Sequence, residues 1–109
     1  MFSEKNFSNN NEKLEKMLNN TENFREALES GNLVEAENFL NDIASNPEKF
    51  PQYDERWLDH RQRELFQSYY KAEDWQGAKR VVEATADSQS QEGRRNRLEE
   101  LSGLKYDEI

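Results

Sequence analysis

The chain contains no cysteine, which excludes disulfides, thiolate catalysis and thiolate metal ligands. It contains one histidine, His60, and real metal sites need three or four convergent ligands, so we expect His60 to be a surface residue and no metal to be bound. The sequence holds no run of about 18 apolar residues, the length that a helix needs to cross a membrane. The polar N-terminus has no secretory pattern. We therefore expect a cytoplasmic protein without a cofactor and without membrane contact.

Apolar residues are also scarce. They make up 33% of the 109 residues, and charged residues make up 35%. This supply suffices for one small helical core but leaves little to wall a deep active-site pocket. The net charge of -8 disfavours phosphate backbones as partners, since their binding needs clustered lysine and arginine. We expect neither direct nucleic-acid contact nor enzyme activity, and we assign no catalytic residue.

A repeated pattern is the main positive feature of the sequence. Residues 24–44 read FREALESGNLVEAENFLNDIA, and residues 66–86, at an offset of 42, read FQSYYKAEDWQGAKRVVEATA. Each copy holds an aromatic residue, then a turn with asparagine or aspartate, then an alanine. Two copies of one helix–turn–helix pattern predict stacked helical hairpins. The matching pairs are Phe24 with Phe66, Asn32 with Asp74, Ala36 with Ala78, and Ala44 with Ala86.

Apolar spacings of three and four predict helices throughout, and no segment alternates like a strand, so the expected class is all-α. Asp54, Asp74 and Asn32, the last paired with Glu35, are the expected helix caps. The single domain should span residues 11–104, between a disordered tail at 1–10 and a short tail at 105–109. Within it we expect hairpin 1 at about 11–46, an extended connector at 47–53, hairpin 2 at about 54–86 and a C-terminal helix at about 90–102.

The second copy resembles the tetratricopeptide family of helical hairpins. Glu73-Asp74-Trp75 resembles its turn, and Ala78 resembles the small residue of its second helix. The chain departs from that family where Phe24 and Phe66 replace very small residues, and it holds only two units at an unusual spacing. The resemblance implies a right-handed stack of hairpins, and a compact helical bundle is the alternative that the pattern leaves open.

The same resemblance implies a groove lined by the first helix of each hairpin, here the first and third helices of the chain. Tyr69 and Tyr70 are neighbours on a helix and point about 100° apart, so one of them is a candidate anchor in that groove. The basic residues on this face favour an acidic or C-terminal peptide as the guest. Carried over residue by residue, the partner-binding positions are Arg25, His60, Arg63, Gln67, Tyr70 and Lys71.

These observations lead to a hypothesis of a non-catalytic protein–protein interaction module that binds a peptide or partner surface. Two alternatives stay open: an acidic inhibitor that mimics nucleic acid in a basic site of its partner, and a structural helical homodimer. Two basic clusters are present, a tight one of Arg94, Arg95 and Arg97 and a sparser one of Arg56, Arg61 and Arg63 on the third helix. For these clusters we expect ion pairs with the neighbouring Glu92, Glu99 and Glu64.

Overall fold

The computed structural model describes residues 22–109, and within this range the predicted all-α class is confirmed, with five α-helices and no strand. The predictions for residues 1–21, the tail at 1–10 and the start of the first helix at 11, lie outside the described residues. No helix in the described range is long and apolar enough to cross a membrane. The helices are residues 22–30, α2 (Leu33–Ser45), α3 (Glu55–Lys71), α4 (Trp75–Ala84) and α5 (Ser88–Ser102), followed by the short 3-10 helix η1 (Tyr106–Glu108).

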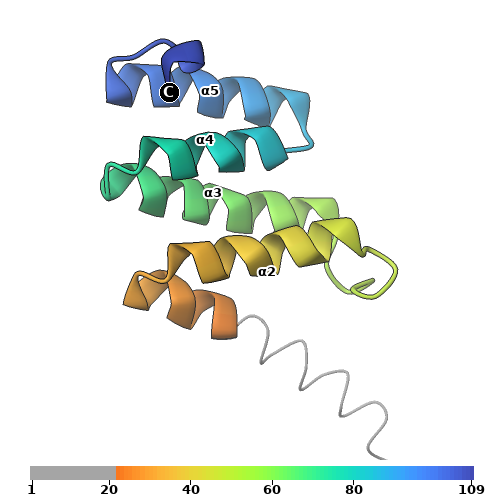
Figure 1. The fold of residues 1–109 in the computed structure, drawn as a ribbon. Coiled ribbons are helices and arrows are strands. Elements are labelled where there is room, and N and C mark those ends of the chain that lie inside the picture. Colours follow the sequence, from red (N-terminus) through yellow and green to blue (C-terminus); the bar gives the residue numbers. More distant parts are fainter. Residues whose placement is uncertain (1–21) are drawn as a thin grey trace, which may run out of the picture.

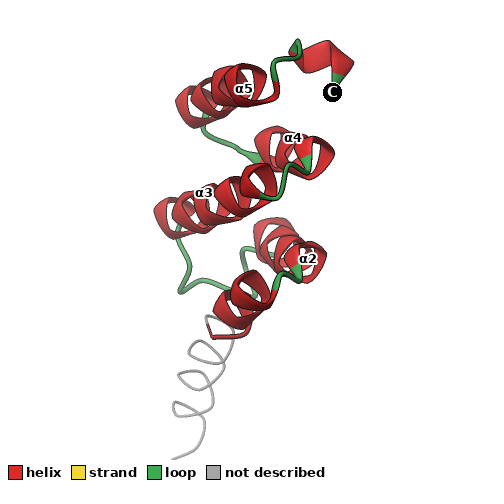
Figure 2. Cartoon of the chain, turned by 90° about the vertical axis from the view of Figure 1, so that its left-hand side faces the viewer, coloured by secondary structure: helices red, strands yellow, loops and turns green. Residues whose placement is uncertain are grey.

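Consecutive helices run antiparallel and follow one another as a stack (Figure 1). Figure 2 shows that the helices alternate between two sides, with α3 and α5 on one side and α2 and α4 on the other. α3 contacts α2 and α4, which precede and follow it in the chain, and it also contacts α5, which lies in the same layer. α3 and α5 are therefore neighbours within one layer of the stack.

The 42-residue repeat is present in the backbone as well as in the sequence. Gly31 and Glu73, at equivalent positions, have positive φ angles of 83° and 57°. The next residues, Asn32 and Asp74, donate their backbone N–H to a carbonyl five residues earlier, at 2.8 and 2.9 Å. Both hairpins thus turn through the same left-handed C-terminal motif. Glycine adopts it freely, whereas a left-handed glutamate is strained by about 1–2 kcal/mol.

Aspartate side chains cap the N-termini of three of the four helices α2 to α5. The carboxylates of Asp54 and Asp74 accept the backbone N–H three residues on, at 2.8 and 2.9 Å, as predicted. Asn32 precedes α2, but its side chain makes no capping hydrogen bond, so the predicted Asn32–Glu35 cap is not formed. Asp87 caps α5 in the same way at 2.9 Å, and α5 therefore begins earlier than the predicted start at residue 90.

The core follows from the small residues of the repeat. Ala36 and Ala78 are fully buried, because a methyl group lets adjacent helices approach closely. Tyr69 takes the repeat position of Ala27, and Gly77 makes room for its ring. A Cβ at residue 77 would lie 2.3 Å from a ring carbon of Tyr69, so packing requires this glycine. The other buried apolar side chains are Phe24, Ala27, Leu40, Ile43, Leu65, Phe66, Val81, Val82 and Leu98.

Aromatic stacking fastens the connector at 47–53 to α3. The ring of Tyr53 stacks on Trp57 with centroids 4.0 Å apart and on Phe50 with centroids 6.2 Å apart. Stacked rings at these separations stabilise beyond their buried area. The packing of Phe50 and Tyr53 onto the body agrees with the sequence-based prediction.

Residues 105–109, predicted to be a short tail, instead fold back as η1 against α4 and α5. The ring of Tyr106 lies between Lys79 and Arg95, whose charged groups are each 4.7 Å from its centre. Both cations are attracted to the ring faces. The backbone N–H of Tyr106 donates to the Glu99 carboxylate at 2.7 Å. Cation–π contacts therefore order this segment, and the spacing of apolar residues in the sequence could not predict them.

Candidate functional site

A groove of about 420 Å³ lies between α3 and α5. These two helices share one layer of the stack (Figure 2). Its two walls come from segments that are distant in the sequence but adjacent in the stack. The α3 wall consists of Asp59, Arg63, Phe66, Gln67 and Tyr70, and the α5 wall consists of Ser90, Gly93, Arg94 and Arg97.

Three polar side chains of the α3 wall have no hydrogen-bond partner within residues 22–109. They are Arg63, Gln67 and Tyr70, whose spacing of four and three residues places them on one helix face. The ring of Tyr70 is held edge-on against Phe66, with centroids 5.3 Å apart, while its hydroxyl forms no hydrogen bond with any residue of the described range. A guanidinium, an amide and a hydroxyl are thus available to a molecule in the groove.

Arg94 fixes the α5 wall relative to α3. Its side chain is buried, and its guanidinium donates to the Thr85 hydroxyl at 2.9 Å and to the Asp59 carbonyl oxygen at 3.0 Å. It also forms an ion pair with the Asp59 carboxylate at 3.0 Å. A buried charge is tolerated only when paired and hydrogen-bonded in this way. One side chain therefore ties α5 to α3 and to the C-terminal end of α4.

The groove is positively charged on a chain of net charge -8. Three arginines line it against one carboxylate, that of Asp59, which Arg94 neutralises. Arg97 pairs with Glu100 at 3.2 Å, an exposed contact that water weakens. Arg63 has no ion pair in the part of the chain that the structure describes. Arg63 is therefore the least compensated cation of the groove.

The C-terminal basic cluster forms ion pairs, but with partners other than those predicted. Arg94 pairs with Asp59 and Arg97 with Glu100, whereas Arg95 faces the ring of Tyr106. Glu64 forms the predicted kind of ion pair with Arg61 on α3, at 2.9 Å. Within residues 22–109, Glu92 and Glu99 form no ion pair with the C-terminal cluster. Sequence proximity suggested them, and the stacking of α5 on α3 supplied a closer carboxylate.

The structure brings three of the six predicted site residues into this groove, namely Arg63, Gln67 and Tyr70. His60 and Lys71 are exposed on α3, and Arg25 is exposed on the helix at 22–30, but none of them lines it. The predicted groove between the first and third helices depends in part on residues 11–21, outside the described residues.

Sequence reasoning missed the second wall of the groove. Ser90, Gly93 and Arg97 were not predicted as site residues, and Arg94 was considered only for ion pairing. The repeat could have indicated them, because a helix following the second hairpin takes the place of the first helix in a third unit. Such a helix joins the layer of α3, as α5 does (Figure 2).

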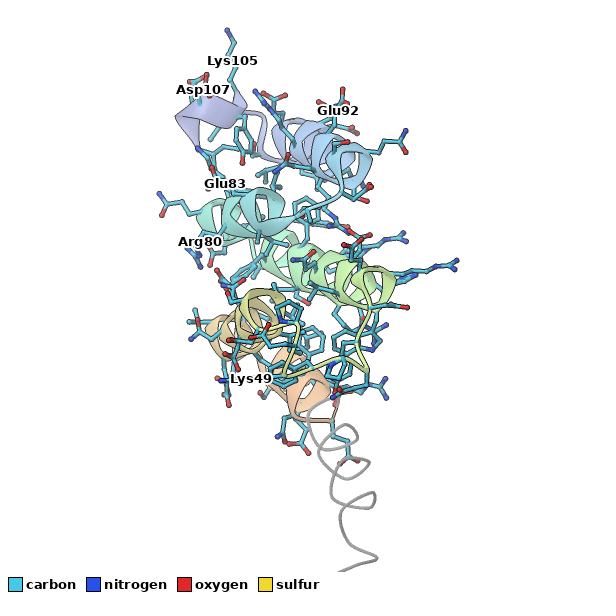
Figure 3. All side chains as sticks on the ribbon, turned by 90° about the vertical axis from the view of Figure 1, so that its right-hand side faces the viewer. Lys49, Arg80, Glu83, Glu92, Lys105 and Asp107 are labelled. Atoms are coloured by element: carbon cyan, nitrogen blue, oxygen red, sulfur yellow. The ribbon has the colours of Figure 1, made fainter. Side chains whose placement is uncertain are left out.

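A second polar cluster joins α2, α3 and α4 at the hydroxyl group of Tyr69. The Tyr69 hydroxyl and the Arg80 guanidinium both donate to the Glu37 carboxylate, Arg80 at 2.9 and 3.1 Å. Figure 3 shows Arg80 extending from α4 on the side of the stack opposite the groove. Burial and the hydrogen bond to Glu37 raise the pKa of Tyr69 to about 12. Glu37 also raises the pKa of Arg80. The closed bonding of this cluster indicates a structural role.

The described residues contain no cluster of three or more side chains suited to a metal ion. Comparison of the chain with protein-family models, curated proteins and solved structures finds no significant match. The geometry of the α3/α5 groove is therefore the observation on which a functional proposal rests.

Proposed function

We propose that this protein is a non-catalytic interaction module of the cytoplasm that binds an acidic peptide segment of a protein partner in the α3/α5 groove. The observation that carries the proposal is the row of Arg63, Gln67 and Tyr70. Their polar groups lack partners within residues 22–109 and line a positively charged groove.

A peptide satisfies these groups with its own chemistry. A carboxylate can accept two hydrogen bonds from the Arg63 guanidinium, and such charge-assisted bonds are stronger than neutral ones. The Gln67 amide can both donate to and accept from a peptide backbone, and the Tyr70 hydroxyl can do the same. Tyrosine and arginine are also enriched among residues that dominate interface energies. An acidic segment matches the groove in charge as well as in hydrogen bonding.

The stacked hairpins support the same function. The shared left-handed turns at Gly31 and Glu73 and the two helix layers are consistent with a tetratricopeptide-like stack. Stacks of this kind present extended surfaces that bind other proteins. We therefore extend the resemblance of the sequence to a proposal about the way the partner is held.

The proposal can be tested by selecting random dodecapeptides displayed on phage against the full chain. The most enriched peptide is then synthesised with fluorescein, and its affinity is measured by fluorescence anisotropy. We expect enrichment in aspartate and glutamate, and we expect Arg63→Glu to weaken binding by about tenfold or more. Arg56→Glu is the matched control, because Arg56 is exposed on the same helix but does not line the groove.

Four results would count against the proposal. Selection without acidic enrichment would remove the charge argument, and equal losses for Arg63→Glu and Arg56→Glu would indicate a long-range field instead of a groove contact. If no peptide is enriched and the protein sediments at twice the monomer mass, the homodimer alternative replaces it. Enrichment of basic peptides would favour the acidic-inhibitor alternative.

A further inference from the structure

Gly93 is a glycine for which residues 22–109 offer no internal explanation. Gly31 and Gly103 have positive φ angles of 83° and 73°, and Gly77 faces the ring of Tyr69. Gly93 lies in the interior of α5 without a positive φ, and a Cβ added to it would meet no atom within 4 Å. Neither the backbone conformation nor the packing of the free protein requires a glycine there.

A glycine at this position weakens α5, because glycine is the poorest helix former after proline. α5 is also weakly anchored by apolar packing, since its buried residues are only Arg94 and Leu98. Alanine would fit the space and favour the helix. A feature that disfavours folding without an internal reason points to a requirement outside the free chain.

Gly93 lines the α3/α5 groove together with Arg63 and Arg97. Arg97 lies one helical turn beyond Gly93 on the same face of α5. The bare Cα and peptide groups of Gly93 therefore form part of the groove wall, where another residue would place a side chain. Close approach of another backbone is a recognised use of glycine.

We propose that Gly93 is the position at which the backbone of a bound acidic peptide crosses α5, an inference that rests on the proposed function. The close approach lets peptide carboxylates reach Arg63 on one wall and Arg97 on the other. Gly93 is thus a positioning residue: it contributes no charge, but it sets how deeply the peptide lies between the two arginines.

Gly93→Ala separates stability from binding. We expect the melting temperature to rise by about 2–8 °C, because alanine favours the helix. We expect the affinity for the fluorescein-labelled acidic dodecapeptide selected on the wild type to fall by about fivefold to a hundredfold, as crowding of a packed contact does. Asn96→Ala is the control, since Asn96 is exposed on α5 and does not line the groove. It should leave the affinity unchanged.

The outcomes distinguish this inference from the proposed function. If Gly93→Ala keeps full affinity while Arg63→Glu still weakens binding, the role of Gly93 is overturned and the groove remains the binding site. A lower melting temperature for Gly93→Ala would assign the glycine a structural role and also overturn the inference. If no acidic peptide binds the wild type, the proposed function and the role of Gly93 both fall.

Discussion

Replacing Gly77 by alanine tests the packing of the repeat most directly. A Cβ at this position would lie 2.3, 2.4 and 2.8 Å from three ring atoms of Tyr69. These separations are far inside van der Waals contact, so the ring of Tyr69 or the axis of α4 must move. The ring has little room, because Tyr69 is 1% exposed and its hydroxyl is bonded to Glu37.

The expected loss of stability follows from three contributions. Forcing an extra methyl group into a packed core costs about 1–3 kcal/mol. Breaking the hydrogen bond between Tyr69 and the charged Glu37 adds about 1.5–3 kcal/mol. The better helix propensity of alanine offsets about 1 kcal/mol of this loss of stability. Gly77→Ala should therefore lower the free energy of unfolding by about 1.5–5 kcal/mol.

Urea denaturation followed by far-UV circular dichroism measures this loss. Gly93→Ala is the matched comparison, since the same substitution in open space should raise the free energy of unfolding by about 0.5–1 kcal/mol. In a Tyr69→Leu background, Gly77→Ala should lose most of its effect, because the two changes share one contact. Equal stability of wild type and Gly77→Ala, or the same sign for both glycines, would refute the packing argument.

Two further predictions concern pH and the second turn. The folded state holds the Tyr69 proton up to a pKa of about 12, while an unfolded tyrosine releases it near pH 10. The unfolded state then binds fewer protons, so the free energy of unfolding should fall by about 2–3 kcal/mol between pH 10 and 12, seen in urea melts across that range. Tyr69→Phe should remove most of this pH dependence of the free energy of unfolding. The raised pKa of Tyr106 should leave a smaller dependence of the same sign. An unchanged dependence in Tyr69→Phe would contradict its assignment to Tyr69. Glu73→Gly should stabilise the fold by about 1 kcal/mol by relieving its left-handed backbone, which thermal melts can check, and a lower melting temperature would show that the strain is absent.

The fold was predictable where one residue decides a local structure. Asp54 and Asp74 marked the starts of α3 and α4 because an aspartate side chain caps the helix by itself. The start of α5 was missed because Asp87 stands in a polar run that reads equally well as a turn. Asn32 was misread as a side-chain cap, since the backbone turn at Gly31 ends the preceding helix without it.

The candidate site was half predictable, for a related reason. The spacing of Arg63, Gln67 and Tyr70 within one helix is a local property, and the repeat indicated which face they share. The opposite wall depends on which helix lies beside α3, and that is decided by tertiary contacts such as the Arg94–Asp59 ion pair. Gly93 carried no signal in the sequence, because its significance is the space that surrounds it.

The bonds of Arg94 have a consequence for the kinetics of recognition. They hold α3 and α5 together through Asp59 and Thr85 in the unoccupied protein, so the separation of the groove walls is set before a guest arrives. A preformed groove requires little ordering of the protein on association. Association with the peptide should then proceed without a slow rearrangement of the protein. Differences in affinity between peptides should come mainly from their dissociation rates.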